Sequence, residues 1–198
     1  MPTPRPHDDI ETETFAERER IAALLADLTP DQWGADSLCR GWRVREVVAH
    51  MTMPYRTKPL PMLVGLVRAR FSFDRYADRA AHQDTQAMTD ADLLNVFSAN
   101  INHPWRPPGG GVAGALSHDV IHGLDITEPL GLPAPPPDRV ALVLSNAAAR
   151  NLEYFGVNLG GTRLVASDAD VAIGEGREVK LPAKDLILII TGRKPLPA

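Results

Sequence analysis

The sequence predicts a mainly α-helical protein, a helix bundle followed by a small α+β extension, and three observations support this class. Between residues 14 and 156, apolar residues recur three and four positions apart among charged ones, which is the period of helices with one buried face. After residue 156 the pattern changes to short runs of Val, Ile and Leu separated by glycines, as in short strands. With 198 residues, the chain can bury one sizeable core with a small appendage. We therefore expect a disordered lead-in over 1–13, a bundle over 14–156 and an extension over 157–198.

The first two helices follow from apolar spacing and from residues that stop helices. Residues 14–28 carry an apolar stripe, and Thr29-Pro30-Asp31 ends it. The next stretch, QWGADSLCRGW, is a loop with two tryptophans. A second helix is expected from about Val44, and Pro54 ends or kinks it because proline lacks the backbone N–H that a helix interior needs.

The middle of the chain is less regular. Residues 60–73 suit either a helix or a buried connector, and the polar, charged segment that follows leads to Thr89-Asp90. We interpret Thr89-Asp90 as the N-cap region of a helix that runs to about Asn100. The glycines and prolines of HPWRPPGGG mark a loop, after which a helix begins and ends near Glu128-Pro129.

The extension begins after one more long helix, expected over residues 138–155 with Asp138 as its cap. The runs RLVAS, DVAI and EVKL are then expected as strands, and GEGR has the composition of a hairpin turn between the last two. Val171 and Ile173 alternate in step with Val179 and Leu181, so that both arms offer one apolar face. A short helix opens at Pro182 and is closed by Gly192.

Composition excludes several classes of partner. The net charge is −4 and the arginines are dispersed, so we expect no nucleic-acid partner. The longest apolar runs, such as LILII at 186–190, are too short to cross a bilayer, and the N-terminus lacks an apolar signal segment, so we expect no membrane partner. Cys39 is the only cysteine, which favours a reducing, cytoplasmic compartment. We expect a monomer or a homodimer.

Two histidines, His118 and His122, are spaced so that both rings lie on one face of a helix and can reach one metal ion. Asp125 follows three residues later on that face, as a ligand, an orienter of a ligand, a catalytic base, or simply a cap of the helix end. A third histidine, His50, lies on the helix expected from Val44. Three imidazoles around a divalent cation with one open position form a catalytic metal site. The alternative is a pair of partly exposed or hydrogen-bonded helix histidines.

Three segments carry a resemblance to a known family. They are WGADSLCRGWRVREVVAHM, which starts at Trp33, then HDVIHGLDI, and the tail GEGREVKLPAKDLILIITGR. Together they resemble the DinB-like metalloenzymes and, within them, the mycothiol-dependent maleylpyruvate isomerase branch. The resemblance implies a DinB-like four-helix bundle that binds a divalent metal, usually zinc, with His50 as the first ligand and His122 as the last. That branch has a glutamate where this chain has His118, whereas other DinB-like proteins use three histidines. A neutral ligand raises the charge of the site by one unit and should make bound water more acidic.

Further residues have weaker assignments. Arg75 and Arg79 lie in a region where the isomerase branch places a substrate-contacting arginine, and either guanidinium could bind a carboxylate bidentately. A solvated helix face is the alternative for each. Cys39 is expected to be a packing residue rather than a nucleophile, because a lone buried cysteine usually packs.

The leading functional hypothesis is a metal-dependent enzyme that acts on a small molecule with a low-molecular-weight thiol, mycothiol, as cosubstrate. Metal ligation favours the thiolate, which would add to an electrophilic carbon in transferase or cis–trans isomerase chemistry. Zinc suits imidazole ligands best, and Ni²⁺, Fe²⁺ and cobalt also fit. The second hypothesis is a hydrolase that activates water. The third is a non-catalytic module that binds a metal or a ligand.

Overall fold

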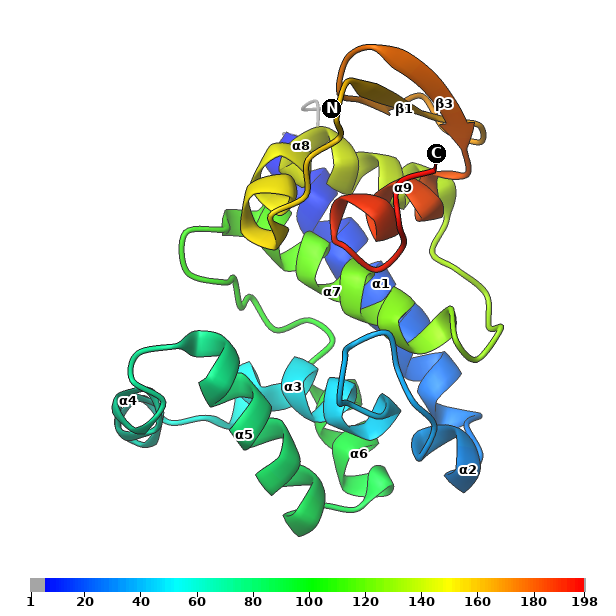
Figure 1. Ribbon diagram of the computed structural model, residues 1–198. Coiled ribbons are helices and arrows are strands. Elements are labelled where there is room, and N and C mark those ends of the chain that lie inside the picture. Colours follow the sequence, from blue (N-terminus) through cyan, green and yellow to red (C-terminus); the bar gives the residue numbers. More distant parts are fainter. Residues whose placement is uncertain (1–5, 198) are drawn as a thin grey trace. The chain divides into compact units, whose positions relative to one another are not determined.

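The computed structural model describes residues 6–197, with side chains from residue 9 onward, and in this range the chain forms nine helices and a three-stranded sheet (Figure 1). The mainly α class with a small C-terminal α+β part is therefore confirmed. Among the described residues, no helix is long and apolar enough to span a membrane. The elements in chain order are α1 (Pro6–Ala26), α2 (Pro30–Trp33), α3 (Val44–Arg56), α4 (Pro59–Arg68), α5 (Phe73–Ala87), α6 (Asp90–Ala99), α7 (Gly111–Thr127), α8 (Pro137–Phe155), β1 (Thr162–Ala166), β2 (Ala172–Ile173), β3 (Arg177–Leu181) and α9 (Ala183–Ile190).

The chain divides into two compact units, and the division falls inside α1. The unit that we call the α3 unit consists of residues 18–105, with the second half of α1 and helices α2 to α6. The other, which we call the α7 unit, consists of the chain up to Glu17 and from Arg106 onward. Since α7, α8, the sheet and α9 all belong to it, the extension expected from residue 157 shares one compact unit with the helices that precede it.

Helix α1 begins at Pro6, well before the expected start at Thr14. Its early residues include Asp9, Glu11 and Glu13, and acidic side chains near a helix N-terminus are stabilised by the positive end of the helix dipole. Residues 1–5 of the expected lead-in lie outside the described residues. The predicted stop at Thr29 is confirmed, and Thr29 also opens α2 through a reciprocal capping box with Gln32.

In the α3 unit, α3 packs against α2, α5 and α6. Its apolar stripe supplies fully buried side chains, among them Val44, Val47 and Val48, and α6 contributes Leu93 and Phe97. Pro54 does not end α3, which continues to Arg56; proline in the last turn removes only the hydrogen bond that its N–H would have given to the carbonyl of His50.

The stretch 60–73 is not a buried connector: residues up to Arg68 form α4, none of whose ten described residues is buried, and residues 69–72 link it to α5. The polar segment after it, which the periodicity did not mark as a helix, forms α5 with the Ser72 hydroxyl as N-cap. The Thr89 cap predicted for α6 is confirmed, and its hydroxyl accepts from the Asp92 N–H.

In the α7 unit, α7 packs against α8 and α9, and α8 packs against α9. The predicted bounds of α7 agree with the structure, whereas Asp138 lies in the first turn of α8 and is not its cap. The helix starts earlier because Pro137, at the first helical position, already has the backbone angle that a helix needs. Fully buried side chains fill the space between the helices: Leu116, Leu124, Leu144, Leu186, Ile187 and Ile190.

The predicted hairpin between DVAI and EVKL is wrong. The strand order is β2-β1-β3, so β1 lies between them, antiparallel to β2 and parallel to β3. Residues 174–176 pass around the start of β1 instead of making a hairpin turn. There a side chain on Gly176 would collide with the backbone of Gly161, and the Arg177 N–H donates to the Gly161 carbonyl over 2.9 Å. The most buried strand thereby takes the centre of the sheet.

Candidate metal centre

Helix α7 places His118 and His122 one turn apart, as the spacing predicts. The two ring centroids are 4.7 Å apart and the rings meet edge to face at 74°. Both side chains are mostly buried, with 14% and 15% of their surface exposed. Two imidazoles are thus held side by side on one face of α7.

A carboxylate holds each ring through its Nδ1 atom. His118 Nδ1 lies 2.9 Å from Asp119 Oδ1, and His122 Nδ1 lies 2.9 Å from Asp125 Oδ2. An ionised carboxylate only accepts, so each Nδ1 carries a proton, and the neutral form of such a ring has its lone pair on Nε2. Carboxylates placed in this way fix the tautomer and orientation of histidines that bind metals.

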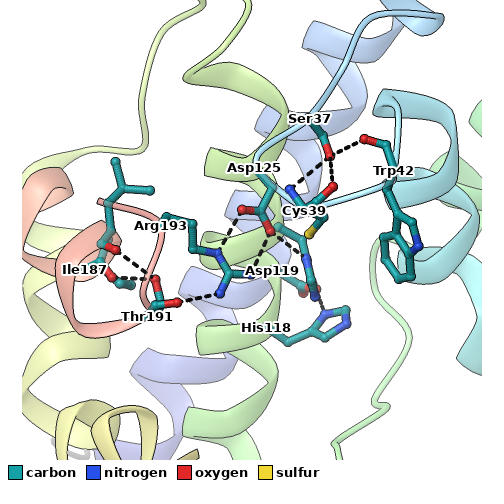
Figure 2. Close-up of polar contacts among 11 residues, drawn as sticks. Ser37, Cys39, Trp42, His118, Asp119, Asp125, Ile187, Thr191 and Arg193 are labelled. Carbon is teal, nitrogen blue, oxygen red and sulfur yellow. Dashed lines mark hydrogen bonds and ion pairs between the residues drawn. The ribbon is translucent and has the colours of Figure 1, made fainter. Parts of the chain in front are cut away.

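Asp125 is fully buried and also pairs with Arg193, which follows α9. Arg193 donates from Nε to Oδ1 over 2.9 Å and from Nη2 to Oδ2 over 3.0 Å, and Figure 2 shows this fork. Arg193 is itself fixed by donating from Nη1 to the Thr191 carbonyl, and its guanidinium lies 4.7 Å from the centre of the Phe155 ring. The guanidinium is therefore held against Asp125 from several sides.

These contacts determine the charge state of the pair. Burial by itself would raise the pKa of Asp125, but the hydrogen bonds from His122 and Arg193 outweigh it and hold that pKa well below its usual range. For His122, burial lowers the pKa, and the nearby His118 and Arg193 lower it further against the opposing effect of Asp125. Asp125 is an anion and His122 is neutral, the form of imidazole that binds a metal.

The α3 unit contains the third predicted ligand, His50, on α3. The side chain is 8% exposed and its ring centroid lies 5.2 Å from that of Trp42. Trp42 donates from Nε1 to Asp78 Oδ1 on α5 over 2.9 Å. The loop before Trp42 is closed by Ser37, whose hydroxyl donates to the Trp42 carbonyl and accepts from the Cys39 N–H (Figure 2).

An ion pair between the buried carboxylate of Glu46 and the half-exposed guanidinium of Arg43 holds the start of α3. Glu46 is 1% exposed and accepts two hydrogen bonds from the Arg43 guanidinium, at 2.9 and 2.6 Å, and one from the Thr85 hydroxyl of α5 at 2.8 Å. Burial raises the pKa of Glu46, and the bonds from Arg43 and Thr85 bring it below its usual value. Glu46 lies one helical turn before His50, so this network fixes the turn on which His50 stands.

The predicted site residues are thus divided between the units. The α7 unit contains His118, His122 and Asp125, and the α3 unit contains His50, Arg75 and Arg79. Both arginine side chains are exposed on α5.

Two residues of the arrangement escaped the sequence analysis. Asp119 follows His118 directly, and the dipeptide was the one available signal for it. Arg193 is 68 residues from Asp125, and no spacing rule relates them.

The donor set of the α7 unit suits a divalent transition metal. Neutral imidazoles with Nδ1 hydrogen-bonded to carboxylates are the usual nitrogen ligands of zinc, nickel and iron. With two such rings on adjacent turns, the chemistry of the residues fits the metal that the resemblance implies.

Comparison with known proteins bears on the family and on the fold. Residues 14–104 match the family model of the mycothiol maleylpyruvate isomerase N-terminal domain. Among solved structures, the chain is similar to the mycothiol-dependent maleylpyruvate isomerase, with 15% identity and a TM-score of 0.63 over 96% of this chain and 90% of that chain. A histidine-to-alanine mutant of that enzyme gives 14% identity with the same TM-score and coverage. No curated protein matches the sequence. The predicted family resemblance and the DinB-like fold are confirmed, and identities this low bear on the fold alone.

Proposed function

We propose that the chain is a metal-dependent enzyme that uses mycothiol, on the premise that residues 14–104 match the family model of the mycothiol maleylpyruvate isomerase N-terminal domain. In this proposal a thiol adds to an unsaturated carbon of a small acidic substrate, in isomerase or S-transferase chemistry. The family match supports the thiol, and the paired histidines of α7 support the metal. We propose an acidic substrate because the guanidinium of Arg75 or Arg79 on α5 could bind a carboxylate.

One observation carries the proposal: two adjacent imidazoles, each with a carboxylate on Nδ1. A solvated helix histidine needs no such partner, whereas a metal ligand commonly has one. We propose that His118 and His122 hold the cation together with His50, whose part rests on the sequence resemblance, and that the cation is zinc. When bound, a divalent cation supplies Lewis acidity, which lowers the pKa of a coordinated thiol or water.

The surrounding residues then have defined roles. Asp119 and Asp125 orient the two rings, and Arg193 keeps Asp125 ionised by donating hydrogen bonds from Nε and Nη2 to its two carboxylate oxygens. Arg79 or Arg75 binds a carboxylate of the substrate, since a guanidinium matches a carboxylate in two parallel hydrogen bonds. A cytoplasmic location and a monomeric or homodimeric state remain predictions that accompany this function.

Metal content tests the site. Elemental analysis of purified protein is expected to give about one zinc per chain in the wild type and a marked loss in His118→Ala and His122→Ala. The matched control is His82→Ala, because His82 is an exposed histidine of α5 outside the proposed site. Unchanged metal content in both α7 variants would contradict the three-histidine site. A loss of metal in His50→Ala would support His50 as the third ligand.

Thiol consumption tests the reaction. The zinc-loaded chain is expected to accelerate the isomerisation of maleylpyruvate, or the consumption of mycothiol by other unsaturated acids, only when mycothiol is present. Arg79→Ala and Arg75→Ala are assayed separately, and the substrate-binding arginine is the one whose loss raises KM. Metal-dependent hydrolysis of esters or amides without any thiol would favour the hydrolase instead. A metal-loaded chain that is inert in both assays would favour a binding module.

A further inference from the structure

Helix α4 has two apolar faces, and only one of them is packed. Met62 and Leu66 pack on a small cluster formed by Met53, Ala69 and Tyr76. Between them, a side chain on Gly65 would collide with the Tyr76 ring, so α4 lies close against α5 at this point (Figure 1). The packed face is therefore defined, and the orientation of the helix within the α3 unit is fixed by it.

The opposite face is apolar and exposed. Leu60, Leu63, Val64 and Val67 recur three and four residues apart, which places them on one stripe, and they are 71%, 55%, 41% and 52% exposed. Phe71, just after the helix, is 74% exposed. We call these five side chains the α4 stripe. A helix that is apolar all round is normally buried, and a contiguous exposed apolar patch usually marks an interaction site.

The charged residues of α4 and of the chain on either side of it are of one sign. Residues 47–73 contain no Asp or Glu, although the chain has 25 acidic residues among 198 and a net charge of −4. Lys58, Arg68 and Arg70 are all exposed and flank the stripe at its two ends. Helix α4 and its flanks are thus basic on an acidic protein, with the first acidic residue, Asp74, at the start of α5, and this local charge complements an anionic partner.

We propose that α4 binds the surface of an anionic lipid bilayer. The α4 stripe would enter the boundary between headgroups and acyl chains, with Lys58, Arg68 and Arg70 at the lipid phosphates, which is the arrangement of interfacial amphipathic helices. A second copy of the chain fits less well, because pairing two stripes would bring their basic residues together. With ten residues, α4 is far too short to span the membrane.

This proposal departs from the expectation of no membrane partner. That expectation rested on the lack of a segment long enough to cross a bilayer, and the described helices indeed include none. Binding at the surface has a different requirement, an exposed apolar face with basic flanks. The sequence did not reveal it, since residues 60–73 were equally consistent with a buried connector.

Co-sedimentation of the full chain with vesicles tests the proposal. Vesicles of phosphatidylcholine are compared with vesicles of equal parts phosphatidylcholine and phosphatidylglycerol, at low and at high salt. We expect binding to the anionic vesicles only, weakened by salt. The double variant Leu63→Gln/Val67→Gln should lower the partition coefficient roughly tenfold or more, and Lys58→Gln/Arg68→Gln should remove the preference for anionic lipid.

Tyr154→Gln is the matched control, because Tyr154 is an exposed aromatic residue of α8, 65% accessible, and its loss should leave binding unchanged. Circular dichroism verifies that each variant is folded. Three outcomes would overturn the proposal: no binding to anionic vesicles, equal binding by the Leu63→Gln/Val67→Gln variant, or concentration-dependent self-association of the wild type that this variant abolishes. The last result would assign the stripe to a second copy of the chain.

Discussion

The carboxylate of Asp125 accepts hydrogen bonds from the ring of His122 and from the guanidinium of Arg193, all at 2.9–3.0 Å. One buried anion thus ties the histidine pair of α7 to the turn that follows α9. Because Arg193 compensates the charge of Asp125, the neighbouring ring can stay neutral. The C-terminal segment of the chain thereby supports the candidate metal centre directly.

Replacing this anion should affect stability and metal binding together. Asp125→Asn leaves the buried guanidinium of Arg193 without a counter-charge, so the free energy of unfolding is expected to fall by about 3–5 kcal/mol. Zinc affinity should also fall, roughly 10–100-fold, because His122 loses the partner that orients it. Urea unfolding of the metal-free protein and competition with a chelator measure the two effects.

Asp119→Asn is the matched control for this prediction. Asp119 holds His118 through a hydrogen bond to Nδ1, so zinc affinity should fall similarly in this variant, whereas the loss of one hydrogen bond should change the unfolding free energy by only about 1 kcal/mol. Equal losses of stability in the two variants would show that the charge of Arg193 is not the reason for the cost.

Acid should destabilise the metal-free protein in two steps. The pKa of His122 is lower in the folded state, so as pH falls below its ordinary value of 6.5 the unfolded chain takes up the proton first and stability is lost. The slope for one proton is at most about 1.4 kcal/mol per pH unit. The carboxyl pKa values of Asp125, Glu46 and Glu128 are also lowered, so their contribution is present above about pH 4.5 and is lost at lower pH.

Between about pH 6.5 and pH 5, the loss of stability is therefore expected to come from His122 and not from the three carboxyl groups. Urea midpoints of wild type and His122→Gln at pH 8 and pH 5 provide the comparison, and the variant should lose much less stability between them. A wild-type midpoint that does not change over this range would contradict a buried neutral His122.

How much of this site could be predicted depends on the range of the interactions. The pairing of His118 with His122 follows from the helical period alone, and α7 lies where its glycines and apolar spacing placed it. The contact between Arg193 and Asp125 could not be predicted from local spacing, because it depends on how α9 packs against α7.

Local patterns also failed to predict two features of the fold, helix α5 and the pairing of the strands. Helix α5 has a stripe made partly of small side chains, Ala77 and Ala81, which apolar periodicity hardly registers. The sheet has matching apolar alternation on β2 and β3, yet that pattern is equally satisfied when each strand pairs with β1. Binding of a metal by His50 and the α7 pair is a prediction from pattern and resemblance.

The Glu46 network should be essential for the position of α3. Glu46→Gln removes a buried charge that accepts from Arg43 and Thr85, and hydrogen bonds to charged groups are worth about 1.5–3 kcal/mol. The free energy of unfolding should fall by about that amount. Glu178→Gln is the control, because Glu178 and Arg163 form an exposed pair whose loss should cost under about 1 kcal/mol. Similar costs for the two variants would refute a special role for the buried carboxylate of Glu46.

The path of the chain around the start of β1 should depend on Gly176. This residue has φ = 108°, a conformation that side-chain-bearing residues rarely adopt, and an added Cβ would collide with the backbone of Gly161, which cannot rotate away as a side chain can. Backbone strain alone costs on the order of 1–3 kcal/mol, so Gly176→Ala should exceed that range once the collision is added. Gly160→Ala isolates the strain, because Gly160 has φ = 57° and open space where its Cβ would lie, and it should cost only about 1 kcal/mol. Thermal unfolding of both variants measures the difference. If the two substitutions cost the same, β3 does not depend on close approach at Gly161, and a direct β2–β3 hairpin would again be compatible with the sequence.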